Sequence, residues 1–313
     1  MKKLTVILMV LALVFTSVFA QGAAEGATTA KKGSVYWLNF KPESDAVLQE
    51  VAKAYTAETG VEVKVVTAAS GTYNETLTAE MDKTNPPTLF VVGNQGAVAS
   101  WGDFCLDLTG TPIANELSTD AYNLYDANGK LCSIGYTYEC FGIIVNKALL
   151  AKAGYSIDQI TNFESLKAIA EDIHARSKEL GFDAFTSAGM DGSSSWRFSG
   201  HLANVALFYE SRDAGNWTET PATISGKYLP NFKNLWDLYI NNSAYAPNSL
   251  ATGGYDAEAE FGKGQAVFYQ NGSWEYANLV TDTDKGFLMN ADDLAMIPIY
   301  CGVEGEEKSG LCC

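Results

Sequence analysis

The sequence predicts an α/β protein built from more than one domain, and two observations lead to this expectation. The chain has 313 residues, whereas a typical domain has about 150, so two domains are expected. Strand and helix patterns also alternate along the chain, which is typical of parallel sheets covered by helices. Hydrophobic residues make up 47% and charged residues 19%, and this composition excludes a disordered chain, a collagen-like repeat and a coiled coil.

The first strands and helices are expected between residues 34 and 92. Stretches rich in β-branched and aromatic residues predict strands at 34–40, 61–67 and 88–92. Helices are expected between them at 43–58 and 73–83. The first helix is predicted from the helical spacing of Val47, Val51, Ala54 and Tyr55, and Gly60 provides its stop. The order β-α-β-α-β predicts a parallel sheet with ligands at the carboxyl ends of its strands.

A second series of elements follows the turn DANGK at residues 126–130. It begins with a strand-rich stretch at 131–146. A long helix is then predicted with Asn162 as its cap, Gly181 as its end and an apolar stripe made of Leu166, Ile169, Ala170 and Ile173. Further strands are expected at 184–189, 265–270 and 294–300, with helices at 197–209 and 229–241.

The first 20 residues have the features of a secretory signal peptide. Lys2 and Lys3 precede an apolar run at residues 4–15, and Val18 and Ala20 occupy the −3 and −1 positions of a cleavage site. The run is shorter than the roughly 20 residues of a membrane span. No cysteine lies near the cleavage site, so a lipid anchor is not indicated. We expect a freely soluble protein, exported to the periplasm or the extracellular medium.

Charge and missing motifs exclude several function classes. Lys and Arg number 21 against 37 Asp and Glu, a formal charge of −16, and so strong a negative charge disfavours nucleic acids and anionic lipids as partners. Neither a nucleophile elbow nor a phosphate-binding loop occurs. No cofactor is expected. Zinc is disfavoured because there are only two histidines and no C-x-x-C pair.

Six cysteines are present, and an oxidising compartment would allow them to form disulfides. Their spacing shows no disulfide framework, so buried free thiols are favoured and disulfides remain the alternative. The six are Cys105, Cys132, Cys140, Cys301, Cys312 and Cys313.

Polar and aromatic residues stand at the predicted strand ends, where an α/β cleft would lie. Lys41, Pro42 and Glu43 end the first strand, and Asn271 and Trp274 follow residues 265–270. A sugar needs this mixture, because its ring faces stack on aromatic side chains while its hydroxyls bind carboxylates, amides and arginine. Taken singly, each residue is equally compatible with a helix cap, a core aromatic or a solvated charge.

Four blocks of sequence, in order, resemble the extracellular solute-binding proteins of bacterial ABC importers, family 1, in the carbohydrate-binding branch that includes maltose-binding proteins. They are the signal peptide, the segments at 36–64 and 138–154, and GKGQAVFYQNGSW at 262–274. The resemblance implies a type II periplasmic binding protein fold. Its two lobes, 33–138 and 139–313, would each be a mostly parallel sheet flanked by helices, and hinge closure would clamp a sugar between them.

The resemblance also implies site residues. Glu139 would hold sugar hydroxyls at the first crossover between the lobes, Trp274 would stack on the sugar with Asn271 beside it, and Trp196 and Arg197 would contribute from the second lobe. The first-lobe candidates are placed by strand-end position and are Glu43, Tyr73 and Asn94. No catalytic or metal-binding residue is expected.

The function expected from the resemblance is that of a non-catalytic, monomeric component that binds a mono- or oligosaccharide and delivers it to ABC permease subunits. Family members usually continue beyond the strand at 294–300, so the resemblance implies an incomplete first lobe and a second lobe without its final helices. The alternatives are a sugar-sensing module, a truncated copy without function and a secreted glycosidase that would use paired carboxylates.

Overall fold

The structure is a computed structural model that describes residues 32–187, 195–215, 223–245, 256–281, 287 and 289–306. The expected signal peptide at residues 1–20 lies outside this range, as do Cys312 and Cys313. The chain separates into two compact units, one ending at Val91 and the other beginning at Val92. The lobe boundaries implied by the resemblance, 33–138 and 139–313, remain a prediction. Among the described residues, no helix is long and apolar enough to cross a membrane.

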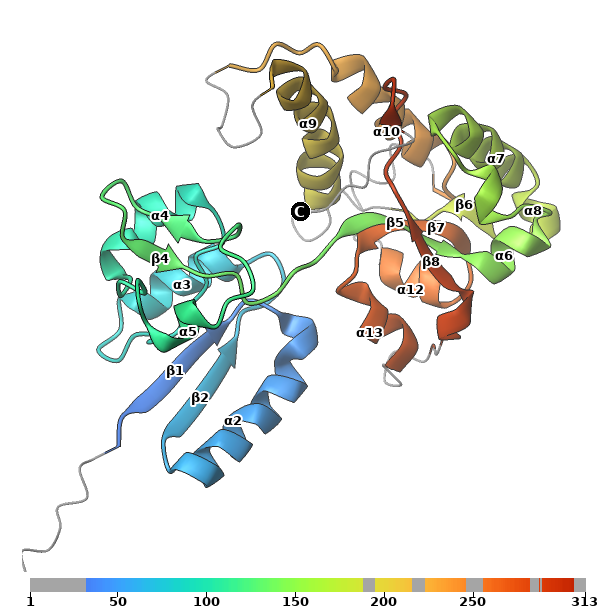
Figure 1. The fold of residues 1–313 in the computed structure, drawn as a ribbon. Coiled ribbons are helices and arrows are strands. Elements are labelled where there is room, and N and C mark those ends of the chain that lie inside the picture. The colour runs from blue at the N-terminus through green and yellow to red at the C-terminus, as the bar shows by residue number, and fades with distance from the viewer. Residues whose placement is uncertain are drawn as a thin grey trace, which may run out of the picture. The chain divides into compact units, whose positions relative to one another are not determined.

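In the first unit, two parallel strands are joined by a helix (Figure 1). The elements are β1 (Ser34–Asn39), η1 (Pro42–Ser44), α2 (Asp45–Thr59), β2 (Glu62–Thr67) and α3 (Tyr73–Met81). Gly60 has a φ of 70°, and its N–H donates to the Thr56 carbonyl. This is the left-handed stop that favours glycine, so the predicted end of the helix is confirmed.

The expected strand at 88–92 is reduced to one bridge, in which Leu89 lies parallel to Trp37. Leu89 donates to the Tyr36 carbonyl over 3.0 Å and accepts from the Leu38 N–H over 2.9 Å. The ladder ends there because the next available N–H, that of Val91, donates to the Tyr73 hydroxyl over 2.7 Å instead. A side chain from α3 thus takes the place of a backbone partner.

Helix α2 forms where its apolar spacing predicts it, but it buries a different face. Val47, Val51 and Tyr55 are 62%, 52% and 49% exposed, and Ala52 is the buried residue of this helix. The period of 3.6 residues identifies a helix and an apolar stripe. The period does not identify the face that contacts β2. Here that face carries Ala52, whose small side chain allows close approach.

The second unit begins with short elements: α4 (Gln95–Trp101), η2 (Gly102–Phe104), α5 (Pro112–Asn115), β3 (Leu124–Tyr125) and β4 (Leu131–Ser133). Strands β3 and β4 pair in antiparallel fashion. The predicted turn at 126–130 joins them. Its Asp126 carboxylate accepts from the N–H groups of Asn128 and Lys130 over 2.8 and 2.9 Å, which is how a short acidic side chain stabilises a turn.

The main sheet of the second unit has the order β6-β7-β5-β8. Its strands are β5 (Phe141–Asn146), β6 (Asp183–Phe185), β7 (Ala266–Gly272) and β8 (Leu294–Ile297). Strand β5 is antiparallel to both β7 and β8, whereas β6 and β7 are parallel. The α/β class is confirmed, but the expected mostly parallel pairing is wrong for this sheet, because the one reversed strand lies between two others. A buried strand has the same apolar pattern in either direction, so the sequence did not reveal the reversal.

Helices cover both faces of this sheet (Figure 1). The helical segments of this part of the chain are α6 (Lys147–Lys152), η3 (Ile157–Gln159), α7 (Phe163–Ala175), α8 (Ser177–Leu180), the π-helical segment η4 (Arg197–Leu202), α9 (Ala203–Ala214), α10 (Leu229–Asn241), α12 (Ala257–Gly262), α13 (Glu275–Thr281) and η5 (Ala291–Asp293). Along β5, Ile143 and Val145 belong to the larger core and Ile144 to a smaller one. Successive side chains point to opposite faces, so one strand contributes to both cores.

The long helix α7 confirms most of its prediction. Asn162 caps it, since the side-chain oxygen accepts from the Ser165 N–H over 2.9 Å, and the apolar stripe from Leu166 to Ile173 is buried. The helix ends at Ala175, and Gly181, with a φ of 81°, ends the following turn α8. The stop signal is therefore used one element later than predicted.

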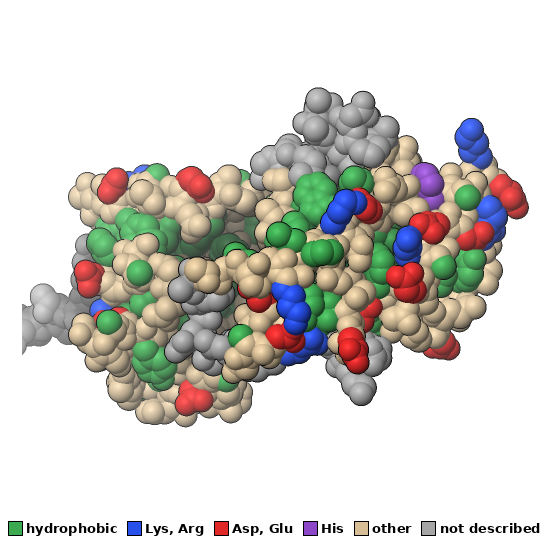
Figure 2. Space-filling model, turned by 90° about the horizontal axis from the view of Figure 1, so that it is seen from above, with side chains coloured by type: hydrophobic (Ala, Val, Ile, Leu, Met, Phe, Trp, Pro, Cys, Tyr) green, Lys and Arg blue, Asp and Glu red, His purple; other side chains and the backbone are tan. Residues whose placement is uncertain are grey.

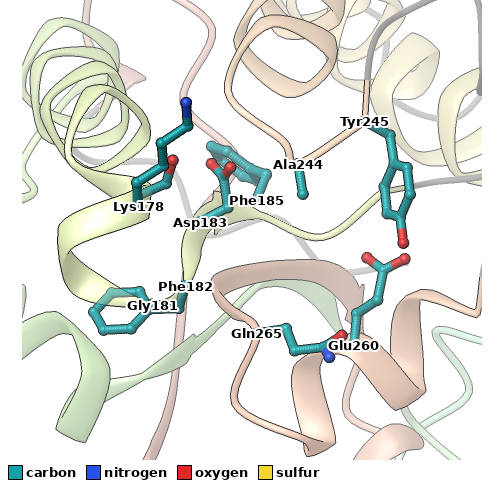
Figure 3. Close-up of a pocket in the computed structure, with 10 residues that line it drawn as sticks. Lys178, Gly181, Phe182, Asp183, Phe185, Ala244, Tyr245, Glu260 and Gln265 are labelled. Carbon is teal, nitrogen blue, oxygen red and sulfur yellow. The ribbon is translucent and has the colours of Figure 1, made fainter.

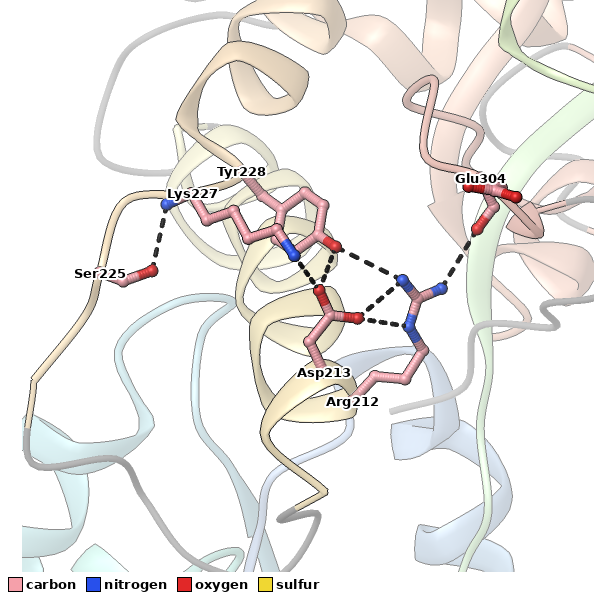
Figure 4. Close-up of polar contacts among 6 residues, drawn as sticks. All are labelled: Arg212, Asp213, Ser225, Lys227, Tyr228 and Glu304. Atoms are coloured by element: carbon pink, nitrogen blue, oxygen red, sulfur yellow. Dashed lines mark hydrogen bonds and ion pairs between the residues drawn. The ribbon is translucent and has the colours of Figure 1, made fainter.

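Polar contacts tie α9 to the segment before α10 (Figure 4). The Asp213 carboxylate accepts from Lys227, from the Tyr228 hydroxyl and, over 2.9 Å, from Arg212. Lys227, then Tyr228 and Arg212, hold the pKa of Asp213 well below its usual range. In Figure 2, several Lys and Arg side chains lie next to Asp or Glu side chains.

We expect Asp213→Asn to lower the melting temperature at neutral pH. A depressed pKa in the folded state contributes stability above the unfolded-state pKa near 3.9 and loses it as the pH falls through the folded value. The difference between variant and wild type should therefore shrink as the pH drops below about 4. Calorimetry at pH 7 and at pH 3 checks this, and an equal difference at both pH values would contradict it.

Candidate functional site

The end of β7 and the segment η4 bring aromatic and polar side chains together. We call this group the tryptophan cluster, and it consists of Trp196, Arg197, His201, Tyr269, Asn271 and Trp274. The rings of Trp196 and Trp274 lie 6.4 Å apart at 47°. His201 contacts both tryptophans: the centre of its ring lies 4.9 Å from that of Trp196 and 5.7 Å from that of Trp274.

Trp274 is held against the backbone of β7. A Cβ atom at Gly272 would lie 2.1 Å from the Trp274 ring, so only glycine leaves room for the indole there. The intervening Ser273 donates its N–H to the Cys140 carbonyl over 2.8 Å and accepts from the Cys140 N–H at its hydroxyl over 3.2 Å. These two bonds anchor the loop that carries Trp274 to the start of β5.

Tyr269 is hydrogen-bonded to two polar side chains of the cluster. Its hydroxyl accepts from Arg197 over 3.1 Å and from the Asn271 amide over 2.6 Å. Asn271 is fully buried, yet its side-chain oxygen and the Nε of Arg197 have no hydrogen-bond partner among the described residues. An unpaired buried polar atom costs about 1–3 kcal/mol. Both atoms are buried away from solvent, so the fold itself carries this cost.

The electrostatics of the tryptophan cluster favour a neutral imidazole beside one fixed cation. Burial, reinforced by the Arg197 charge, lowers the pKa of His201 to about 4, although a contact of 2.7 Å with Gln270 opposes the shift. The Arg197 guanidinium lies 4.5 Å from the Trp196 ring centre, close enough for a cation–π contact. Burial also raises the pKa of Tyr269. The cluster therefore presents hydroxyl and amide groups with a single guanidinium at neutral pH.

Four of the eight predicted site residues lie in the tryptophan cluster: Trp196, Arg197, Asn271 and Trp274. Glu139 is half-buried and directly precedes Cys140, the residue bonded to Ser273. It thus stands one residue from the contact that anchors the Trp274 loop. The role of these five residues in binding remains a prediction, but the first four converge in space.

The other three candidates lie elsewhere in the fold. Glu43 is in η1 and Tyr73 in α3, both in the first unit, while exposed Asn94 accepts from the Ala97 N–H over 2.8 Å and caps α4. Tyr73 is buried, and its hydroxyl donates to the Leu38 carbonyl over 3.4 Å and accepts from Val91. These contacts give Tyr73 and Asn94 a structural role, and a ligand role for the three stays a prediction.

The sequence-based prediction missed two members of the tryptophan cluster, His201 and Tyr269, and also Gln270, which contacts His201. A signal for two of them was present. His201 follows Arg197 by four residues, the spacing of neighbours on a helix, and Tyr269 precedes Asn271 by two, the spacing of one strand face. No sequence signal identified the Gln270 contact, because it depends on how η4 packs against β7.

A separate cavity of about 390 Å³ lies beside β6, lined in part by Lys178, Asp183, Tyr245 and Glu260 (Figure 3). Glu260 and Tyr245 point toward each other there. Burial raises the pKa of Glu260, which accepts from the Ser187 N–H over 2.7 Å. None of the predicted site residues lines this cavity. In the described part of the chain, no group of side chains has the arrangement of a metal site.

Comparison with solved structures identifies the class of fold. A RafE protein in complex with raffinose superimposes with a TM-score of 0.66 at 18% identity, over 87% of this chain and 69% of that chain. The acarbose-binding GacH receptor of Streptomyces glaucescens gives 0.62 at 19%, over 88% and 68%. A maltose-bound MalE3 of T. maritima gives 0.61 at 19%, over 86% and 68%. The fold is that of the type II periplasmic binding proteins.

The family follows from the sequence. Residues 50–307 match the model of the bacterial extracellular solute-binding proteins, and this chain belongs to that family. No curated protein matches the sequence. The resemblance stated from four sequence blocks is thereby confirmed at the level of family and fold.

We expect Gly272→Ala to displace the Trp274 ring, since the ring atoms within 2.4 Å of the new Cβ are the movable end of a side chain. Near-ultraviolet circular dichroism and tryptophan fluorescence should change while far-ultraviolet dichroism does not. Gly200→Ala is the matched control, because a Cβ there meets nothing within 4 Å. Identical tryptophan spectra for wild type and Gly272→Ala would refute the close contact.

The depressed pKa of His201 makes the stability pH-dependent in a defined window. The unfolded chain binds this proton near pH 6.5 and the folded chain near 4, so acidification across that window destabilises the protein. His201→Gln should remove roughly 2–3 kcal/mol of this pH dependence. In the His174→Gln variant the remaining imidazole signals in NMR report His201, and a midpoint near 6.5 would contradict the assignment.

Proposed function

We propose that this protein binds a carbohydrate and delivers it to the permease of an ABC importer. The observation that supports this most directly is the tryptophan cluster, which combines two indole rings with a buried amide and a guanidinium. Apolar ring faces for stacking and polar groups for hydroxyls are the two things that a sugar needs. Its neutral His201 and uncharged Asn271 suit an uncharged ligand.

The fold relatives support the same ligand class. The structures described above contain raffinose, acarbose or maltose, and another relative is a chitin oligosaccharide binding protein. All of these proteins are 18–19% identical to this chain. A binding experiment with both mono- and oligosaccharides is therefore needed to identify the ligand of this chain.

We propose that binding works by hinge closure between two lobes. In the open form, ligand would contact one lobe, and the closed form would be favoured by the contacts that become available with the second. Under this mechanism the tryptophan cluster and Glu139 provide the contacts of the second lobe, and Glu43, Tyr73 and Asn94 those of the first. No catalytic step is needed for this role, and the permease and its ATPase would be separate chains.

The experiment that tests the proposal is thermal melting of residues 21–313 against a panel of mono- and oligosaccharides. A ligand at about 100 times its dissociation constant adds about 2.7 kcal/mol of stability and should raise the midpoint by several degrees. The same complex should show a smaller radius of gyration in X-ray scattering. A cooperative melt that no sugar shifts would contradict the carbohydrate proposal, and turnover of a chromogenic glycoside would favour an enzyme.

Trp274→Ala is expected to weaken binding of the sugar that the panel identifies by about tenfold or more, because a stacking ring is lost. The melting temperature without sugar should change little, since Trp274 is partly exposed. Titration calorimetry gives the dissociation constant.

The matched pair of conservative variants is Trp274→Phe and Trp236→Phe. Trp236 packs on Phe198, with ring centres 4.4 Å apart, and lies outside the tryptophan cluster. Only the Trp274 variant should change affinity, and equal dissociation constants for the two would remove Trp274 from the site.

A further inference from the structure

Two segments of the second unit, each of which carries a cysteine, are joined by hydrogen bonds. Cys105 ends the turn η2, and Cys132 lies in β4. The Leu108 N–H donates to the Leu131 carbonyl over 3.0 Å. The Lys130 ammonium donates to the carbonyls of Gly102 and Cys105 over 2.6 and 3.2 Å. One backbone hydrogen bond and the two hydrogen bonds of the Lys130 ammonium therefore hold the turn η2 against β4.

In this arrangement both sulfur atoms lie near the segment formed by Trp101 and Gly102. The Cys105 thiol donates to the Trp101 carbonyl over 3.4 Å. The Cys132 sulfur lies 3.7 Å from the position that a Cβ of Gly102, the next residue, would occupy. Burial, together with the neighbouring Cys132 thiol, raises the pKa of Cys105. The two sulfur atoms thus lie beside consecutive residues of the chain, Trp101 and Gly102.

We propose that Cys105 and Cys132 form a disulfide once the protein has been exported. Only weak interactions hold the thiols in their present positions, since each donates a single S–H hydrogen bond, to the Trp101 carbonyl over 3.4 Å and to the Lys130 carbonyl over 3.5 Å. Bond formation requires the two side chains to rotate until the sulfurs are about 2.05 Å apart. The compartment to which this family is exported maintains disulfides.

The other two cysteines that the structure describes have different surroundings. The backbone of Cys140 binds Ser273, at the start of β5. Cys301 is buried, its N–H donates to Glu306 over 2.7 Å, and burial raises the pKa of its thiol to about 12.

The reaction is a thiol–disulfide exchange with a disulfide-bearing oxidant, either an oxidoreductase of the compartment or glutathione disulfide. Half-buried Cys105 attacks first as a thiolate, forms a mixed disulfide and releases one thiolate of the oxidant. Buried Cys132 then attacks the Cys105 sulfur and releases the second thiolate. The two protons lost by the cysteines end on the two released thiols, so the protein loses two hydrogens and the oxidant gains them.

The bridge would close the loop from Cys105 to Cys132, which contains α5, β3 and the turn at Asp126. Cross-linking a loop of this length restricts the unfolded chain. We expect the melting temperature of the oxidised protein to exceed that of the reduced protein by about 5–10 °C.

The test uses the full chain, reduced and then equilibrated with glutathione disulfide, with free thiols alkylated in denaturant before non-reducing digestion. Mass spectrometry should find one peptide pair joined through Cys105 and Cys132, lighter by two hydrogens than the reduced peptides, with Cys140 and Cys301 alkylated. The sugar response is not part of this test. Its outcome is therefore separate from that of the proposed function.

Matched variants complete the experiment. Cys105→Ser and Cys132→Ser should each abolish the reductant-sensitive part of the melting temperature, and Cys140→Ser should retain it. Recovery of both Cys105 and Cys132 in alkylated form from the oxidised wild type would overturn the proposal, as would a bridge from either one to another cysteine. The mapping on the wild-type chain decides the question even if a serine variant fails to fold.

Discussion

Strand β7 is buried at every position from Ala266 to Gly272, and the second unit is organised around this constraint. A strand without an exposed face needs neighbours on both edges and apolar layers on both sides. Strands β5 and β6 supply the edges. The larger core with α7, α9 and α10 covers one face, and the smaller core around Phe261, Tyr269 and Leu279 covers the other. About 25 cal/mol per Å² of buried apolar surface makes this arrangement strongly favourable.

The same strand carries the polar end of the site. Its last residues, Gln270, Asn271 and Gly272, are as buried as its apolar ones, and a polar amide in such a place is tolerated only with partners. Tyr269 and His201 provide some of them. Because β7 cannot move without disrupting two cores, it holds Tyr269 and Asn271 of the tryptophan cluster in fixed positions. A binding site with fixed side chains loses less conformational entropy when its ligand binds.

Local patterns predicted most elements of the fold but not their partners. Helix α10 begins and ends at the expected residues, 229 and 241, and Asn162 caps α7 as its short polar side chain predicts. The reversal of β5 was not predictable, because burial on both faces hides strand direction. The exposure of Val47 and Val51 on α2 was not predictable either, because the packed face is set by the elements that surround a helix and not by its own period. Glu306 extends this contrast: in a Gly- and Glu-rich stretch that reads as a loop, its buried carboxylate accepts from Cys301 and from Phe163 at the start of α7.

The sequence by itself determined the α/β class, the positions of most helices and strands, and the family. These depend on residue spacing and on short contiguous motifs, which can be recognised without the structure. It also gave Trp196, Arg197, Asn271 and Trp274 as candidates, all four through the resemblance to the solute-binding family and the last two also by their place after a predicted strand. Only the tertiary structure decided that these four converge, that His201 joins them in a buried position that lowers its pKa, and that Cys105 and Cys132 lie near the same segment, Trp101–Gly102. Each of these is a contact between segments distant along the chain, and such contacts are set by how the cores pack.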